Sequence, residues 1–477
     1  MDGFSAFRML GLPSPGRPVS LNLSSNMRTL VLPASLALFF SFSHAEDWPR
    51  FHGPNGSGVT SEMRIPVPPE DATVRWTIDL PGVGHGSPVI HGQRLFLLCA
   101  TEAPSKGKGK GKGQRKGRDK GNGGPTPPRA SPDGEATAPV AQRWMPLCLS
   151  TRDGSILWRD ELSGGDFSGH RFNSPASTTP AVDGKRVVFT WGTAESLTMA
   201  AYSLEGKHLW KRDLGPVAGG HGFAASPVLL GDLIVLNNDQ EDARGGLLGI
   251  DANTGEVKWT VARHSKRLSY SVPCVVHRSG RDLLVFTNWT HGFTVVDARD
   301  GAVVSEKSVF KQESNERAIS SPVAWRDLVI GTCGFTANPK HCVAMRVDEA
   351  GQLSEVWRVE KNVPHIPSVL VVGDRCYLWD DAGIVSCLDA ATGREIWKGR
   401  VPGVEGHCMG SPVSDGSSIC SLDESGNLHA IATGDALAPL GMRPLGDPCR
   451  STPAFGDGAM FVRTVHRLFA FEGAGAR

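Results

Sequence analysis

The sequence predicts an all-β protein: an eight-bladed β-propeller of four-stranded antiparallel blades, closed by an N-terminal outer strand. Three observations predict this fold: an X-Pro dipeptide that recurs along the chain, short apolar runs between turn residues, and a tryptophan near the end of most repeats. A period of roughly 40–50 residues with short β runs is typical of a propeller, in which each repeat forms one blade.

The X-Pro dipeptides set the period. From Pro180 onward the prolines follow one another at intervals of 47, 46, 49, 45, 45 and 41 residues. Proline suits the first residue of a strand, where its missing donor costs nothing, so each proline is expected to open the first strand of a blade. The dipeptides are Ser87-Pro88, Thr179-Pro180, Ser226-Pro227, Val272-Pro273, Ser321-Pro322, Ile366-Pro367, Ser411-Pro412 and Thr452-Pro453.

Each repeat contains four apolar runs, separated by Gly, Asp and Asn, which is the chemistry of strands and turns. The turn before the fourth run holds a glycine in every complete unit, as a turn with positive φ requires. These glycines are Gly154, Gly206, Gly255, Gly301, Gly351, Gly393 and Gly434.

A tryptophan follows that glycine in five repeats, and its ring is expected to pack between neighbouring blades. These residues are Trp158, Trp210, Trp259, Trp357 and Trp397. Ser305 and Ala438 stand at the expected position in the fourth and seventh repeats, so those two interfaces are predicted to be weaker.

Here the chain resembles a known family. GIDANTGEVKW (249–259) and CLDAATGREIW (387–397) resemble the tryptophan-docking repeat of pyrroloquinoline-quinone (PQQ)-type propellers, and residues 200–210 form a degenerate third copy. DWPRFHGPNGSGVTSE (47–62) resembles the segment that precedes blade one in exported proteins of this type. The resemblance covers residues 47–477 and implies a PQQ-like propeller of the quinoprotein alcohol dehydrogenase-like superfamily.

Closure of the ring follows from the two ends of the repeat array. The last unit, from Pro453, supplies three strands, whereas VRWTIDL (74–80) forms a lone strand before the first proline and carries Trp76. Joining them completes the eighth blade and removes free sheet edges. We therefore expect a single PQQ-like propeller domain over residues 46–477.

Residues 1–45 are interpreted as a signal peptide region. Met27 to Ala45 contains one basic residue, an apolar stretch and a Ser43-x-Ala45 cleavage site, and the true start is possible at Met27. The protein is therefore expected to be exported, periplasmic or extracellular in a bacterium, without a transmembrane anchor after cleavage. The absence of a cysteine near the cleavage site argues against a lipid anchor.

A Gly/Lys-rich insert at about 103–142 interrupts the first blade and holds nine Lys/Arg against three Asp/Glu. It lacks apolar residues over 105–124, so it is predicted to be disordered. Such a loop could hold an anionic polymer or membrane surface, although a tolerated surface insertion is the favoured interpretation. Because no aromatic residues interleave with its lysines, sequence-specific nucleic-acid binding is not expected.

The ten cysteines leave two alternatives, disulfides or buried free thiols, and free thiols are slightly favoured. The spacing suggests four candidate pairs: Cys376 with Cys387, Cys333 with Cys342, Cys99 with Cys148, and Cys408 with Cys449.

Cationic or aromatic residues lie shortly before each proline and are expected to surround the mouth of the central channel. Such a ring suits an anionic or hydroxyl-rich ligand, and the alternative is that each residue only caps a loop between blades. Since free imidazole titrates near about pH 6.5, ligand binding is expected to strengthen as the pH falls toward about 5.5. The candidate ring is His85, Arg171, His221, Tyr270, Arg317, His365, His407 and Arg450, with His170 beside Arg171.

Acidic residues are expected on the same face, where they could pair with these cations or hold Ca²⁺, but their spacing matches no known calcium loop. They are Asp239, Asp242, Asp380 and Asp381. We therefore predict no metal site.

The favoured function is an exported, non-catalytic scaffold that binds a protein, a polysaccharide or an anionic ligand on its loop face, as a monomer and without a cofactor. The repeat type is similar to that of the propeller lipoprotein of bacterial outer-membrane assembly. The alternative is a quinoprotein-type dehydrogenase that uses PQQ with Ca²⁺. Against it, the sequence lacks the adjacent cysteine pair and the haem Cys-x-x-Cys-His motif of those enzymes, so no catalytic residue is assigned.

Overall fold

The computed structural model describes residues 47–102, 142–170, 172–265, 267–310, 317–334 and 340–474. The chain divides into a unit of Met1–Ser43 and a unit of His44–Arg477. The predicted signal peptide, the start at Met27 and nearly all of the basic insert lie outside the described residues. No helix in the described part of the chain is long and apolar enough to span a membrane.

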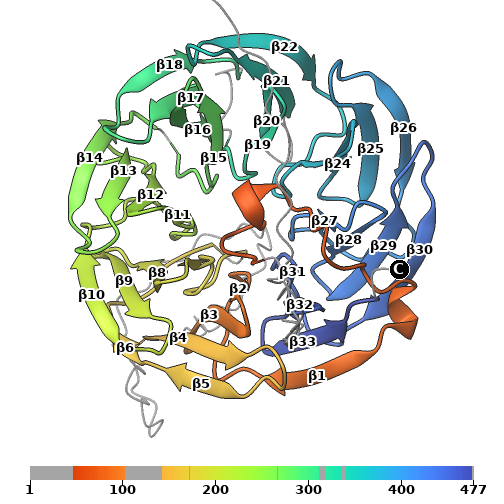
Figure 1. The fold of residues 1–477 in the computed structure, drawn as a ribbon, viewed down its shortest axis with the longest axis horizontal. Coiled ribbons are helices and arrows are strands. Elements are labelled where there is room, and N and C mark those ends of the chain that lie inside the picture. The colour runs from red at the N-terminus through yellow and green to blue at the C-terminus, as the bar shows by residue number, and fades with distance from the viewer. Residues whose placement is uncertain are drawn as a thin grey trace, which may run out of the picture. The chain divides into compact units, whose positions relative to one another are not determined.

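Residues 47–474 form a closed ring of eight antiparallel sheets, which confirms the predicted propeller (Figure 1). Seven sheets have four strands, and the sheet of blade one has a fifth, β6 (Leu162–Ser163), which pairs with β4. The first strand of each blade lies nearest the centre and the last lies on the outside (Figure 1).

The strands of blades one to four, from the centre outward, are β2 (Val89–His91), β3 (Arg94–Ala100), β4 (Arg143–Ser150) and β5 (Ile156–Arg159); β7 (Ala181–Val182), β8 (Arg186–Gly192), β9 (Leu197–Ser203) and β10 (His208–Asp213); β11 (Val228–Leu230), β12 (Leu233–Asn238), β13 (Gly246–Asp251) and β14 (Val257–Ala262); β15 (Cys274–Arg278), β16 (Arg281–Asn288), β17 (Gly292–Asp297) and β18 (Val303–Lys307).

Those of blades five to eight are β19 (Val323–Trp325), β20 (Leu328–Cys333), β21 (His341–Val347) and β22 (Leu353–Val359); β23 (Leu370–Val372), β24 (Arg375–Trp379), β25 (Ile384–Asp389) and β26 (Glu395–Arg400); β27 (Val413–Ser414), β28 (Ser418–Leu422), β29 (Asn427–Ala432) and β30 (Pro439–Pro444); β31 (Ala454–Gly456), β32 (Ala459–Arg463), β33 (Arg467–Glu472) and β1 (Val74–Asp79).

The N-terminal strand closes the ring as predicted. β1 pairs with β33 in antiparallel register, with Trp76 opposite Ala470. Blade eight is therefore built from both ends of the described chain, and its outer strand is the first strand in sequence.

The tryptophans of the outer strands dock onto the next blade. Trp259 donates its Nε1–H to the carbonyl of Ala298 at 3.1 Å, and a Cβ at Gly301 would lie 2.8 Å from its ring. Only glycine fits there, at a φ of 75°. Five other tryptophans donate in the same way to the following blade: Trp76, Trp158, Trp210, Trp357 and Trp397. The hydrophobic core consequently lies between blades, where the facing sides of two sheets pack together.

Two interfaces lack this tryptophan. Ser305 occupies the position in blade four, opposite Val295, as predicted. In blade seven the residue opposite Ala430 is Gly441, so the prediction of Ala438 was wrong. The other blades have the same bulge, so the difference lies in the turn: Gly434, at a φ of 142°, stands seven residues before Gly441, whereas Gly255, at a φ of 74°, stands four residues before Trp259.

All ten cysteines are free and buried, so none of the four candidate disulfides forms. The register explains why for the two closest pairs. Cys376 lies opposite Leu388 and Cys342 lies opposite Thr332, each one residue away from its candidate partner. A slip of one residue points two side chains to opposite faces of a sheet, and burial raises the pKa of both thiols.

Candidate functional site

Hydroxyl side chains link the blades around the central channel. The backbone N–H of Ser87 in blade one donates to Thr179 Oγ1 of blade two at 2.9 Å, and the same bond repeats around the ring in the same direction. Seven such bonds join Ser87, Thr179 and Ser226 in one series and Val272, Ser321, Ser368, Ser411, Thr452 and Ser87 in another. The series is interrupted at Val272, which has no hydroxyl. We call these hydroxyl-bearing residues the hydroxyl ring.

In blade six the hydroxyl ring corrects the sequence prediction. The ring residue is Ser368, and β23 begins at Leu370, so Pro367 does not open the strand there. The Ile366-Pro367 dipeptide lies two residues too early to be equivalent to the other seven.

Residues 47–60 cross the centre of the ring (Figure 1). Trp48 pairs with Ile90 of blade one, and Val59 pairs with Ser414 of blade seven. Between them, Asn55 donates its Nδ2–H to the carbonyl of Val275 in blade four at 2.8 Å. This segment, which we call the plug, is the stretch that resembled exported PQQ-type proteins.

Above the plug lies a cavity of about 400 Å³ that is lined by residues from all eight blades. The structure brings seven of the eight predicted ring residues to its wall: His85, His221, Tyr270, Arg317, His365, His407 and Arg450. The eighth, Arg171, lies outside the described residues, but His170 also lines the cavity. Phe51 of the plug and six members of the hydroxyl ring complete the wall, together with apolar residues.

Arg317 is the most buried cation of the mouth, with 5% of its side chain exposed. Its Nη2 donates to His221 Nδ1 at 3.2 Å and to Glu241 Oε1 at 3.3 Å. Burial lowers its pKa. Its Nη1 is buried, and the Tyr270 side chain lies against the guanidinium.

The loop that follows β6 crosses the mouth of the cavity. His170 stacks on His221 with ring centroids 4.8 Å apart. Phe172 reaches the far side, where the Arg450 guanidinium lies 5.5 Å from the centre of its ring and His407 packs at 6.1 Å. Arg450 Nη2 lies 3.7 Å from Glu424. The cations of the mouth are thus partly balanced by acids, and the loop narrows its opening.

Three of the mouth histidines have a pKa that is lowered from the usual value of an imidazole. Burial, aided by the charges of Arg450 and Arg463, lowers the pKa of His85 to about 3. Burial lowers the pKa of His365 to about 4, although Asp381 opposes it. The pKa of His221 is also lowered, by burial and by the charge of Arg317. Burial therefore favours the neutral form of His85 and His365, so these two side chains are expected to act as uncharged hydrogen-bonding groups at mildly acidic pH.

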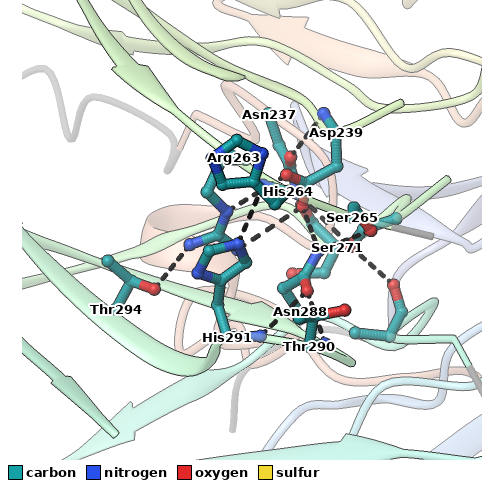
Figure 2. A network of polar contacts seen from close by, with 12 residues as sticks. Asn237, Asp239, Arg263, His264, Ser265, Ser271, Asn288, Thr290, His291 and Thr294 are labelled. Carbon is teal, nitrogen blue, oxygen red and sulfur yellow. Dashed lines mark hydrogen bonds and ion pairs between the residues drawn. The ribbon is translucent and has the colours of Figure 1, made fainter. Parts of the chain in front are cut away.

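A buried polar network supports the loop that carries Tyr270 (Figure 2). Arg263 and Asp239 are both 0% exposed, and Arg263 Nε lies 3.1 Å from Asp239 Oδ1. Asn288 donates to the other oxygen of Asp239 at 2.6 Å. Asn237 donates to the carbonyl of Ser271 at 3.0 Å, which fixes the chain beside Tyr270. Asp239 therefore forms a buried ion pair with Arg263 behind the mouth, and it does not line the cavity.

The donor set does not fit the calcium and PQQ centre of a dehydrogenase. That chemistry needs a free carboxylate as base and several oxygen ligands for the cation. Asp381 is the only carboxylate among the residues that line the cavity. It accepts hydrogen bonds from Lys340 at 2.9 Å and from two backbone amides. No cluster suited to a metal ion occurs within the described ranges.

The sequence predicted the residues of the mouth but not the hydroxyl ring at the base of the cavity. The hydroxyl ring was visible as the Ser or Thr before six of the eight prolines, a regularity that carried a signal of its own. The contributions of Phe51 and Phe172 had no such signal, because the plug and the mouth loop are not repeated.

The fold, the docked tryptophans and the channel define the class: this chain is a PQQ-type β-propeller protein. A family model described as outer membrane protein assembly factor BamB matches residues 147–399 and 343–438. Together the matches span more than half of the 477 residues, so the chain belongs to this family.

Individual relatives are distant. The outer membrane protein assembly factor BamB of Burkholderia pseudomallei (strain K96243) is 23% identical over 324 residues, which cover 66% of this chain and 76% of that protein. The crystal structure of BamB from Moraxella catarrhalis has 14% identity and a TM-score of 0.51, covering 69% of this chain and 91% of that chain. A quinohemoprotein alcohol dehydrogenase from Pseudomonas putida HK5 has 11% identity and a TM-score of 0.44, covering 91% and 81%. The likeness to the solved BamB structure is one of fold.

Proposed function

We propose that this chain is an exported, non-catalytic scaffold of a bacterial envelope, which holds a protein partner on its mouth face. The mouth face is the side of the ring that carries the cavity opening and the loops between the second and third strands of each blade. The relatives in the matching family are described as outer membrane protein assembly factors, which supports a role in holding proteins together.

The observation that carries the proposal is the state of the charged groups at the mouth. Asp381, the one carboxylate among the described residues that line the cavity, is held by Lys340 and two amides, and burial lowers the pKa of His85, His221 and His365. The same loops are fixed relative to one another by the hydroxyl ring. A rigid face suits recognition, because a preorganised surface loses little freedom on binding.

Position-dependent photo-crosslinking tests the proposal. A photoreactive residue at Glu195, exposed on the mouth face of blade two, is expected to crosslink one envelope protein in living cells of the native host. The matched control is Lys185, exposed on the opposite face of the same blade. Equal crosslinking from both positions, or none from Glu195 and from other mouth loops, would contradict a partner on this face.

An activity assay distinguishes the proposed scaffold from a PQQ-dependent dehydrogenase. The purified protein is incubated with PQQ and Ca²⁺, passed over a sizing column and assayed for dye-linked alcohol oxidation. We expect no turnover. Co-elution of quinone absorbance with alcohol oxidation would replace the scaffold by an enzyme.

A further inference from the structure

The hydroxyls at the base of the cavity have protons to donate. Each one accepts a backbone N–H from the neighbouring blade, which leaves its O–H proton for another acceptor. In the described part of the chain, none of the six that line the cavity donates to a protein group, and each residue is only 2–3% exposed. The six are Ser87, Thr179, Ser226, Ser321, Ser411 and Thr452.

Two buried arginines place positive charge behind this ring. Arg463 donates to the carbonyls of Gly86 at 3.0 Å and Leu98 at 2.7 Å, directly behind Ser87. Arg50 donates to the carbonyl of Pro273 at 2.7 Å, next to Val272. They are 0% and 5% exposed, and neither has a carboxylate partner among the described residues. Burying an unpaired charge is costly, so an anion held nearby would stabilise this arrangement.

The rest of the wall indicates an organic ligand. Four apolar side chains also line the cavity: Phe51, Ile319, Ile366 and Met409. A volume of about 400 Å³ is in the usual range for a site that takes a small organic molecule. Inorganic oxyanions would leave these apolar side chains without a contact.

We propose that the cavity binds a small organic carboxylate, held by the hydroxyl ring and attracted by the charge of Arg317 in the cavity wall, with its apolar part against the surrounding side chains. The proposal does not rest on the partner-holding role, because the ligand would lie inside the channel and the partner outside it. O–H donors without competing acceptors select an anion, and the neutral histidines add hydrogen bonds without charge.

Calorimetric titration of the mature protein with benzoate and benzamide tests the proposal. The two probes share size and shape, and only benzoate carries a charge. Benzoate is expected to bind at least roughly tenfold more tightly than benzamide, since hydrogen bonds to a charged group are the stronger kind. Arg317→Gln should weaken benzoate binding by about the same factor. The control Arg299→Gln changes an arginine that is 75% exposed outside the cavity, and should leave binding unchanged.

A second variant adds a donor instead of removing one. Val272→Thr keeps the side-chain volume and supplies the hydroxyl that the ring lacks at this position. It should tighten benzoate binding by about threefold, whereas Val272→Ala should not tighten it. This pair keeps the test decisive even if Arg317→Gln folds poorly.

Three results would overturn the proposal. Benzamide that binds as tightly as benzoate, or benzoate that does not bind at millimolar concentration, would show that the cavity does not recognise a carboxylate. Sulfate that competes as strongly as benzoate would reduce the site to one for inorganic oxyanions. Binding that neither Arg317→Gln nor Val272→Thr changes would place the carboxylate elsewhere.

Discussion

The interfaces on either side of blade four hold neighbouring blades together by different means. Between blades three and four, Trp259 packs on Gly301 and donates to a backbone carbonyl. Between blades four and five the equivalent residue is Ser305, whose Oγ accepts the amide of Leu353 at 3.3 Å. Arg278 adds a bond to the carbonyl of Val347 at 2.8 Å. Both interfaces bury apolar side chains, but the first adds a docked tryptophan and the second adds side-chain hydrogen bonds instead.

The interface of blades seven and eight also lacks the docked tryptophan and has hydrogen bonds at that position. Gly441 stands at the tryptophan position, and the short helix η2 (Pro69–Asp71) packs there instead. Glu70 accepts the amide of Met442 at 3.1 Å, and Arg443 donates to the carbonyl of Ala72 at 2.7 Å. A tryptophan can therefore be replaced wherever other groups bridge the same gap, and the difference should be visible in stability.

Removal of residues 47–80 should have the largest effect, because it takes away the plug, η2 and β1 together. Blade eight would lose its outer strand and expose an unpaired edge. We expect the truncated protein to aggregate, as judged by size-exclusion chromatography. A soluble truncation with unchanged melting temperature would show that these segments do not hold the ring.

Trp259→Ala should destabilise the protein by roughly 3–5 kcal/mol, since it leaves a cavity between blades three and four. Ser305→Ala is the matched change at the polar interface and should cost at most about 1 kcal/mol. Urea denaturation followed by circular dichroism measures both. Equal losses would remove the distinction between the two kinds of interface.

Acid should weaken the ring through His85 and His365, which lie between blades whose outer tryptophans are docked. Their folded pKa values are about 3 and about 4, below the unfolded value of about 6.5. The unfolded chain therefore binds more protons in this window, and stability falls as the pH is lowered from 6.5. Between pH 6.5 and 5 the loss should be roughly 1–2 kcal/mol for each histidine. His85→Gln should flatten this dependence, and an unchanged slope would count against the buried, neutral imidazole.

Arg443→Met should weaken the interface of blades seven and eight by about 1 kcal/mol, through loss of its hydrogen bond to Ala72. Arg299→Met, at an exposed position, is the control and should have no measurable effect. A loss as large as that of Trp259→Ala would mean that the polar bridge is as strong as a docked ring.

Deletion of residues 106–129 should change stability least, because this glycine- and lysine-rich sequence has no apolar residues to bury. The melting temperature measured by calorimetry should stay within error of the full chain. A large decrease would show that the insert packs against the propeller.

The features that recur in every blade could be predicted from the sequence. The docked tryptophans, the turn glycines and the closure by Trp76 each follow from a spacing that recurs, so several copies support each inference. Local irregularities could not be predicted: the different turn that places Gly441 at the docking position, the shift to Ser368 in blade six, and the register that separates Cys376 from Cys387.

The site divides in the same way. Seven mouth residues were located because each precedes a blade, whereas their charge states depend on burial and on Arg317 and Arg463, which come from distant parts of the chain. A single sequence gives no measure of burial at a loop, and for that reason the lowered pKa values of His85 and His365 could not be predicted.

The hydroxyl ring lacks a bond at Val272 in blade four, whereas the ends of the chain meet in blade eight. The missing bond and the closure of the propeller therefore lie in different blades. All other amides of the series meet a hydroxyl of the next blade, but the amide of Ser226 meets a valine. Arg50 and Asn55 of the plug bind the backbone of blade four at Pro273 and Val275, just beside this gap. The plug therefore anchors blade four directly beside the position where the ring has one bond fewer.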